Sequence, residues 1–115
     1  MIEPFCNYKV QEYILGSERW SVTRLIELSK DLKVMEIPLD HMYTGNEYQC
    51  MKLSEMVSHI KSVNNADLSY PIILSADGDI MDGRHRLMKA LLEGAETIKS
   101  VRFDETPYPC RIVDN

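Results

Sequence analysis

The spacing of hydrophobic positions divides the chain into helical and extended segments. Residues 17–33, 51–63 and 84–93 repeat apolar side chains at three- and four-residue intervals and are predicted to be helices. Ser17 is expected to cap the start of the first helix, and Gly94 the end of the third. The clearest apolar stripe consists of Leu53, Met56, Val57, Ile60 and Val63.

Shorter apolar runs predict strands between and after these helices. Asp77-Gly78 separates two of the runs and is a strong hairpin signal. Pro38 favours an edge position for the first strand, because proline offers no N–H to a neighbouring strand. The predicted strands are residues 34–39, 71–74, 79–82 and 98–103, with a further short one within 108–112.

These elements predict an α+β fold with a small mixed β-sheet. The helices at 51–63 and 84–93 are expected to pack against that sheet. We expect one structural unit with two parts, an N-terminal helical extension at 1–33 and a domain at 34–115. Two roles stay open for the extension, a wall of a ligand pocket or a homodimer surface.

Composition and charge narrow the function classes. The 115 residues carry 13 Lys and Arg against 18 Asp and Glu, a net charge of −5. This acidic balance argues against a DNA partner, since nucleic-acid-binding domains usually carry a basic face. The sequence has no apolar run of the roughly 18 residues that cross a membrane. It also has no N-terminal secretory pattern, so we expect a cytoplasmic protein without a membrane partner.

The segment with the most specific chemistry is Gly83-Arg84-His85-Arg86, where a predicted strand passes directly into a helix. A helix start presents unpaired N–H groups and the positive end of the helix dipole. Cations in the first turn oppose that dipole, and a bound anion such as phosphate would reconcile the two. A structural interpretation stays open beside this one, in which Asp79 or Asp82 pairs with Arg86 and His85 only orients the turn.

Beyond local chemistry, the run PIILSADGDIMDGRHRLMKALLEGAETIKSVRF resembles the core of the ParB/sulfiredoxin-like superfamily. That core has a strand, a turn, a strand ending in a G-x-H-R box, a helix, a glycine and another strand. Upstream, VMEIPLDHM resembles the opening strand of the family, and KLSEMVSHIKSV resembles the helix that precedes the Pro-Ile strand. The resemblance covers residues 34–104 in the same order.

In sulfiredoxins, the similar box reads Gly-Cys-His-Arg and holds ATP phosphates at the helix start. The resemblance therefore implies that Gly83, His85 and Arg86 contact phosphate. Arg84 stands in place of the catalytic cysteine, so sulfiredoxin activity is not expected. In ParB proteins an arginine-rich box binds the triphosphate of CTP, and Arg84 and Arg86 make the present box similar in charge.

The family resemblance implies a nucleoside triphosphate with Mg²⁺ as the ligand. It leaves open an ATP- or CTP-dependent phosphotransferase or NTPase activity. Phosphoryl transfer needs acids near the phosphates, and Asp40 and Glu36 are the catalytic candidates because they lie at the end of the first family strand. Asp82 and Asp79 flank the box and are expected to cap the helix, form the turn or accompany Mg²⁺. The sequence has no metal-ligand spacing of its own.

The leading hypothesis is a nucleotide- or phosphate-binding domain with the phosphates held at the Gly83–Arg86 helix start. One alternative is a nucleotide-switched protein-interaction or partition-related module. Another is a ParB-like nuclease or DNA-binding protein. The sequence contains no segment that corresponds to the helix-turn-helix DNA-binding domain of a ParB protein, so a complete partition protein is not expected.

Overall fold

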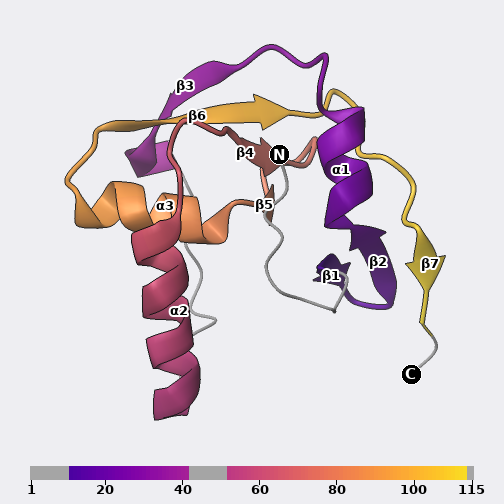
Figure 1. Ribbon diagram of the computed structural model, residues 1–115. Helices are drawn as coiled ribbons and strands as arrows, with labels where there is room; N and C mark the ends of the chain where they lie inside the picture. The colour runs from indigo at the N-terminus through magenta and orange to yellow at the C-terminus, as the bar shows by residue number, and fades with distance from the viewer. Residues whose placement is uncertain (1–10, 42–51, 114–115) are drawn as a thin grey trace.

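The computed structural model describes residues 11–41 and 52–113, which form an α+β fold as predicted (Figure 1). The helices are α1 (Val22–Leu28), α2 (Leu53–Asn65) and α3 (Arg84–Leu92), and a short 3-10 helix, η1, spans Leu39–His41. The strands are β1 (Glu12–Leu15), β2 (Glu18–Ser21), β3 (Met35–Pro38), β4 (Ile72–Leu74), β5 (Ile80–Asp82), β6 (Thr97–Arg102) and β7 (Arg111–Ile112).

The larger sheet has four strands in the order β3-β6-β4-β5. β4 and β6 run parallel and the other neighbours are antiparallel, so the predicted mixed sheet is confirmed. β3, which ends at Pro38, lies at an edge as its proline indicated. The hairpin predicted at Asp77-Gly78 joins β4 to β5, and the Ser75 N–H donates to the Asp79 carbonyl at its base.

The central strands are buried on both faces because their side chains alternate between two apolar clusters. On one face, Ile72 of β4 and Ile98 of β6 pack against Leu87 and Ala90 of α3. On the other face, Ile73 packs in a second cluster whose remaining buried members are Trp20, Leu25, Met81, Val101 and Phe103. The sheet therefore separates α3 from the elements that come before β3.

The predicted helix over residues 17–33 is wrong in its first part. β1 and β2 form an antiparallel hairpin closed by Gly16-Ser17, with Leu15 opposite Glu18. Gly16 has φ +60°, which suits a tight two-residue turn. Ser21, not Ser17, caps α1, and its Oγ accepts a hydrogen bond from the Arg24 N–H. The described part of the extension, residues 11–33, is thus a hairpin followed by a short helix, and residues 1–10 lie outside the described residues.

β2 also pairs with β7, which makes a second sheet in the order β1-β2-β7. Figure 1 shows this sheet and α1 at one end of the molecule, with α3 and α2 below the other end of the larger sheet. Trp20 joins the two parts, because its ring lies in the second cluster and its Nε1 donates to the Pro107 carbonyl at 2.8 Å.

α2 departs from the prediction that it packs against the sheet. It projects away from the sheet in Figure 1 and contacts α3. Of its predicted stripe only Val63 is buried. The other four stripe residues are exposed by 43% or more of their surface: Leu53, Met56, Val57 and Ile60. Within the described residues, no helix is long and apolar enough to cross a membrane.

Candidate functional site

Gly83 forms the junction between β5 and α3. Its φ of +105° lies in the left-handed region, where other residues are strained. A Cβ at this position would lie 2.6 Å from the Ile72 Cγ2 atom, a distance that real contacts do not reach. Glycine is therefore required here for two reasons, and it lets the chain turn from strand into helix directly beside the sheet. No side chain caps the helix start.

Arg86 and Asp82 form an ion pair across this junction. The Arg86 Nη2 atom lies 2.8 Å from the Asp82 Oδ2 atom, and both side chains are 18% exposed. Arg86 also donates from Nη1 to the Pro71 carbonyl at 3.4 Å. The capping role predicted for Asp82 is wrong, since the N-cap residue is Gly83 and the Asp82 carboxylate pairs with Arg86 instead. Burial raises the pKa of the Asp82 carboxyl and outweighs the opposing effect of Arg86.

His85 contacts a second histidine that lies on α2. The Nε2 atom of His85 is 2.7 Å from the Nδ1 atom of His59, a hydrogen bond that joins the two helices. The ring centroids are 5.0 Å apart, with the planes inclined by 46°. Burial lowers the pKa of the half-buried His85 imidazole, and the charges of His59, Arg84 and Arg86 lower it further.

All four residues of the Gly83–Arg86 box line one cleft of about 1140 Å³. Binding sites for small molecules usually enclose about 300–1,000 Å³, so the cleft has room for a ligand of that class. β1 and α1 form one wall, so the described part of the extension lines the cleft, and its role as a homodimer surface stays a prediction. α2 and the loop that follows it form the opposite wall. Polar residues of these two walls include Glu12, Tyr13, Ser58, Lys61, Ser62 and Asp67.

Charged side chains of both signs line this cleft. Three are carboxylates, each with a partner: Glu12 pairs with Arg111, Asp67 accepts from Ser69, and Asp82 pairs with Arg86. Lys61, Arg84 and Arg86 carry positive charge, and the N-terminus of α3 adds the positive end of its dipole. Positive charge therefore concentrates at the start of α3, where Arg84 and Arg86 lie in the first turn.

Tyr13 of β1 lines the same cleft as Arg84. The centroid of its ring lies 5.5 Å from the centroid of the Trp20 ring. Burial raises the pKa of its hydroxyl, the charge of Asp79 raises it further, and Arg84 opposes both. Arg84 and Tyr13 thus act on each other electrostatically, although they are far apart in the sequence.

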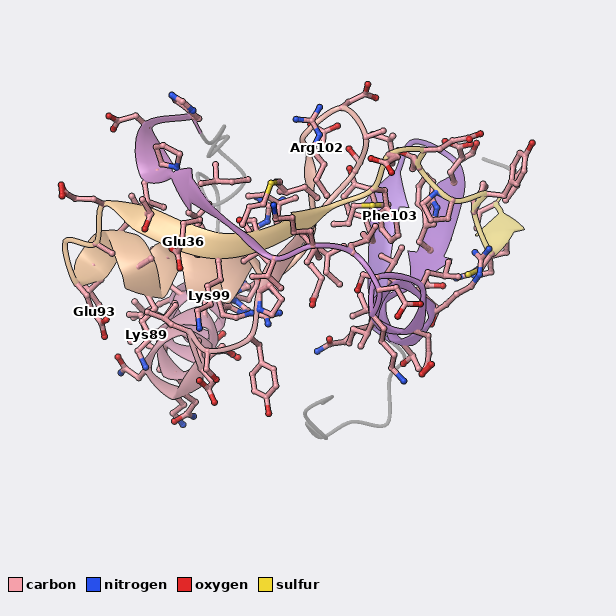
Figure 2. The ribbon with its side chains drawn as sticks, turned by 90° about the horizontal axis from the view of Figure 1, so that it is seen from above. Glu36, Lys89, Glu93, Lys99, Arg102 and Phe103 are labelled. Atoms are coloured by element: carbon pink, nitrogen blue, oxygen red, sulfur yellow. The ribbon has the colours of Figure 1, made fainter. Side chains whose placement is uncertain are left out.

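The structure does not bring the two catalytic candidates to the cleft. Glu36 lies on the edge strand β3 beside Lys99 of β6, at the edge of the sheet opposite β5 (Figure 2). Its Oε1 atom accepts a hydrogen bond from the Thr97 Oγ1 atom at 2.8 Å. Asp40 lies in η1 and is exposed. Neither residue lines the cleft, and their catalytic role stays a prediction.

Asp79 lies beside the β4–β5 turn and lines a smaller cavity of about 300 Å³ rather than the large cleft. Its N–H donates to the Ser75 Oγ atom at 3.1 Å, which agrees with the expected turn role. Within residues 11–41 and 52–113, no three His, Cys, Asp or Glu side chains are arranged to hold a metal ion.

Three residues in or beside the cleft were not predicted from the sequence as site residues: His59, Tyr13 and Lys61. His59 lies four positions before Val63, the buried residue of α2, so the two share a helix face. That spacing is a usable signal, but it needs knowledge of which face is buried. Tyr13 had a clearer signal in Gly16-Ser17, a two-residue turn between extended runs.

Comparison with known proteins gives no relative. No protein-family model, no curated protein and no solved structure matches this chain. The resemblance to the ParB/sulfiredoxin-like superfamily accordingly stays a prediction from the Gly83–Arg86 box and the order of elements around it.

Proposed function

We propose that this chain binds a nucleotide or another phosphate-bearing ligand in the central cleft, with its phosphates at the start of α3. The observation that carries the proposal is that Gly83, Arg84, His85 and Arg86 all line that one cleft. The first N–H groups of a helix have no partner within the helix, and phosphate oxygens accept from such groups.

Each residue of the box has a separate role under this proposal. Gly83 keeps side-chain atoms away from the helix start. Arg84 supplies a guanidinium that matches the geometry of phosphate oxygens. Arg86, held by Asp82 and Pro71, fixes the first turn of α3 and has further N–H donors for a ligand. His85 adds an imidazole within the lining.

The ParB/sulfiredoxin-like fold belongs to the same proposal. The sequence-based order of strand, hairpin, box helix and strand is also the order of β4, β5, α3 and β6. Arg84 stands where a sulfiredoxin has its cysteine, so the proposal concerns nucleotide binding and includes no sulfur chemistry. The interaction-module and nuclease alternatives stay predictions.

A thermal-shift screen tests the proposal. ATP, ADP, CTP, GTP and inorganic pyrophosphate are each added with and without Mg²⁺. A ligand at 100 times its Kd stabilises the folded state by about 2.7 kcal/mol, which gives a shift of several degrees in a domain of this size. Arg84→Gln is the informative variant, because Arg86 substitutions also break the ion pair with Asp82.

We expect at least one nucleotide to raise the Tm of the wild type. Arg84→Gln should weaken that ligand about tenfold or more, the worth of a charged hydrogen bond. Lys99→Gln is the matched control, since it removes one positive charge from an exposed position on β6 that does not line the cleft. A screen without any response, or equal responses in wild type and Arg84→Gln, would overturn the proposal.

A further inference from the structure

The hydrogen bond between His59 and His85 is one of the contacts that join α2 to α3. The Lys89 ammonium of α3 also joins the two helices without the imidazoles, since it donates to the carbonyls of Asn64 and Ala66. Lys89 is labelled on α3 in Figure 2. Two imidazoles 2.7 Å apart nevertheless meet beside the helix start that lines the cleft.

When both rings are neutral, each carries one N–H group. In the contact between them one nitrogen then donates its proton and the other nitrogen accepts it. A further proton converts this contact into an imidazolium–imidazole hydrogen bond, which is stronger because it is charge-assisted. His59 does not itself line the cleft, so it acts on a ligand through His85 and is a positioning residue.

The surroundings of the pair oppose that further proton while the cleft holds no anion. Arg84 and Arg86 flank His85 on α3, and the positive end of the helix dipole points to the same place. An anion at the helix start would place negative charge beside His85 and so favour the protonated imidazole. Two further charged groups, Glu55 and Lys89, lie one helical turn from the pair on its own helices. The other titratable groups of the described chain that line the same cleft are Glu12, Tyr13, Lys61, Asp67, Tyr70 and Asp82.

We propose that the His59–His85 pair takes up a proton when an anion occupies the start of α3, so that the site binds phosphate-class anions more tightly as the pH falls. This inference rests on the proposed function and concerns how the pH regulates anion binding at the same site. Proton and anion stabilise each other reciprocally, because each lowers the electrostatic cost of the other. The proton comes from the solvent, and no covalent bond forms or breaks.

Inorganic sulfate is the probe for the test, because it stays a dianion across the range in which histidine titrates, whereas phosphate groups titrate within it. Sulfate affinity is measured from the amide NMR shifts of residues 83–86 at constant ionic strength, at about pH 7.5 and about pH 5.5. We expect the Kd of the wild type to fall about fivefold or more at the lower pH, the lower end of typical coupling between sites.

The double variant His59→Gln/His85→Gln keeps polar side chains at both positions but cannot take up the proton, and it should lose this pH dependence. His41→Gln is the matched control, because His41 lies in η1 and does not line the cleft. In the wild type alone, saturating sulfate should raise the pKa of His85 measured from its ring signals. This measurement decides the question even if the double variant fails to fold.

The outcomes separate the two proposals. Sulfate binding of equal strength at both pH values, or an undiminished pH dependence in the double variant, overturns the proton coupling and leaves the anion site standing. An unchanged His85 pKa in saturating sulfate does the same. No sulfate binding at either pH, together with no nucleotide response in the thermal screen, overturns both.

Discussion

α2 and α3 meet at the histidine pair, yet they are stabilised in opposite ways. α3 has the shorter apolar pattern, and it buries Leu87 and Ala90 against the sheet. α2 has the clearest stripe in the chain, and it buries Val63 while Leu53 at its start is 77% exposed. The comparison teaches that helical periodicity predicts a helix and its apolar face but does not predict what covers that face.

The cause of the difference is how each helix is connected to the sheet. α3 follows β5 through Gly83 alone, so the chain places it directly on the sheet beside Ile72. α2 begins at Leu53, its N-cap residue Lys52 makes no side-chain cap hydrogen bond, and the chain reaches β4 through residues 66–71. Its position is set by contacts with α3, which include His59–His85 and the two hydrogen bonds of Lys89.

Truncating one leucine in each helix should give the largest difference in unfolding free energy between the two helices. Leu87 is 2% exposed and lies in the cluster under the sheet, so Leu87→Ala should cost about 2–5 kcal/mol of unfolding free energy. Leu53→Ala should change it by about 0.5 kcal/mol or less, because that side chain is mostly exposed. Urea denaturation measures both. Similar losses in the two variants would show that the stripe of α2 is covered in solution.

Replacing each of the two glycines that flank α3 by alanine should give a smaller difference in the loss of stability. Gly83→Ala adds a Cβ against Ile72 at a left-handed φ, and we expect a loss of about 2–4 kcal/mol from strain and overpacking together. Gly94→Ala has a positive φ but open space around the new atom, so the loss should be about 1 kcal/mol. Thermal unfolding distinguishes these values. Equal losses would mean that Ile72 moves aside and does not fix the start of α3.

The smallest effect should be the pH dependence that arises where the helices meet. A histidine whose pKa is lower in the folded chain gives stability that is complete above its unfolded value and is lost as the pH falls through the folded one. The pKa of His85 is lowered, so wild-type stability should decline as the pH falls below about 6.5. His85→Gln should weaken this decline when both proteins are unfolded by urea across that range in an anion-poor buffer.

Asp82 acts with the opposite sign, because a carboxyl with a raised pKa gives stability that is lost as the pH rises through its folded value. Asp82 is present in both proteins, so the difference between wild type and His85→Gln isolates the imidazole. An identical decline in the two proteins would assign the pH dependence to groups other than His85.

Local sequence signals were sufficient wherever the structure depends on adjacent residues. The β4–β5 hairpin followed from Asp77-Gly78, the edge position of β3 from Pro38, and the α3 boundaries from Gly83 and Gly94. Gly16-Ser17 is a signal of the same kind, but the helical spacing of Trp20 and Leu25 competed with it. The tertiary structure decided in favour of the hairpin, because Trp20 packs among Ile73, Val101 and Phe103.

The sequence by itself determined the α+β class, most of the elements and the Gly83–Arg86 box at a helix start. Only the tertiary structure decided that Arg86 pairs with Asp82 and that β1 closes the cleft with Tyr13. It also brought His59 to His85 and left Glu36 at the far edge of the sheet. Turns and caps are set by residues next to each other, whereas these contacts join segments that only the packing of the whole chain brings together.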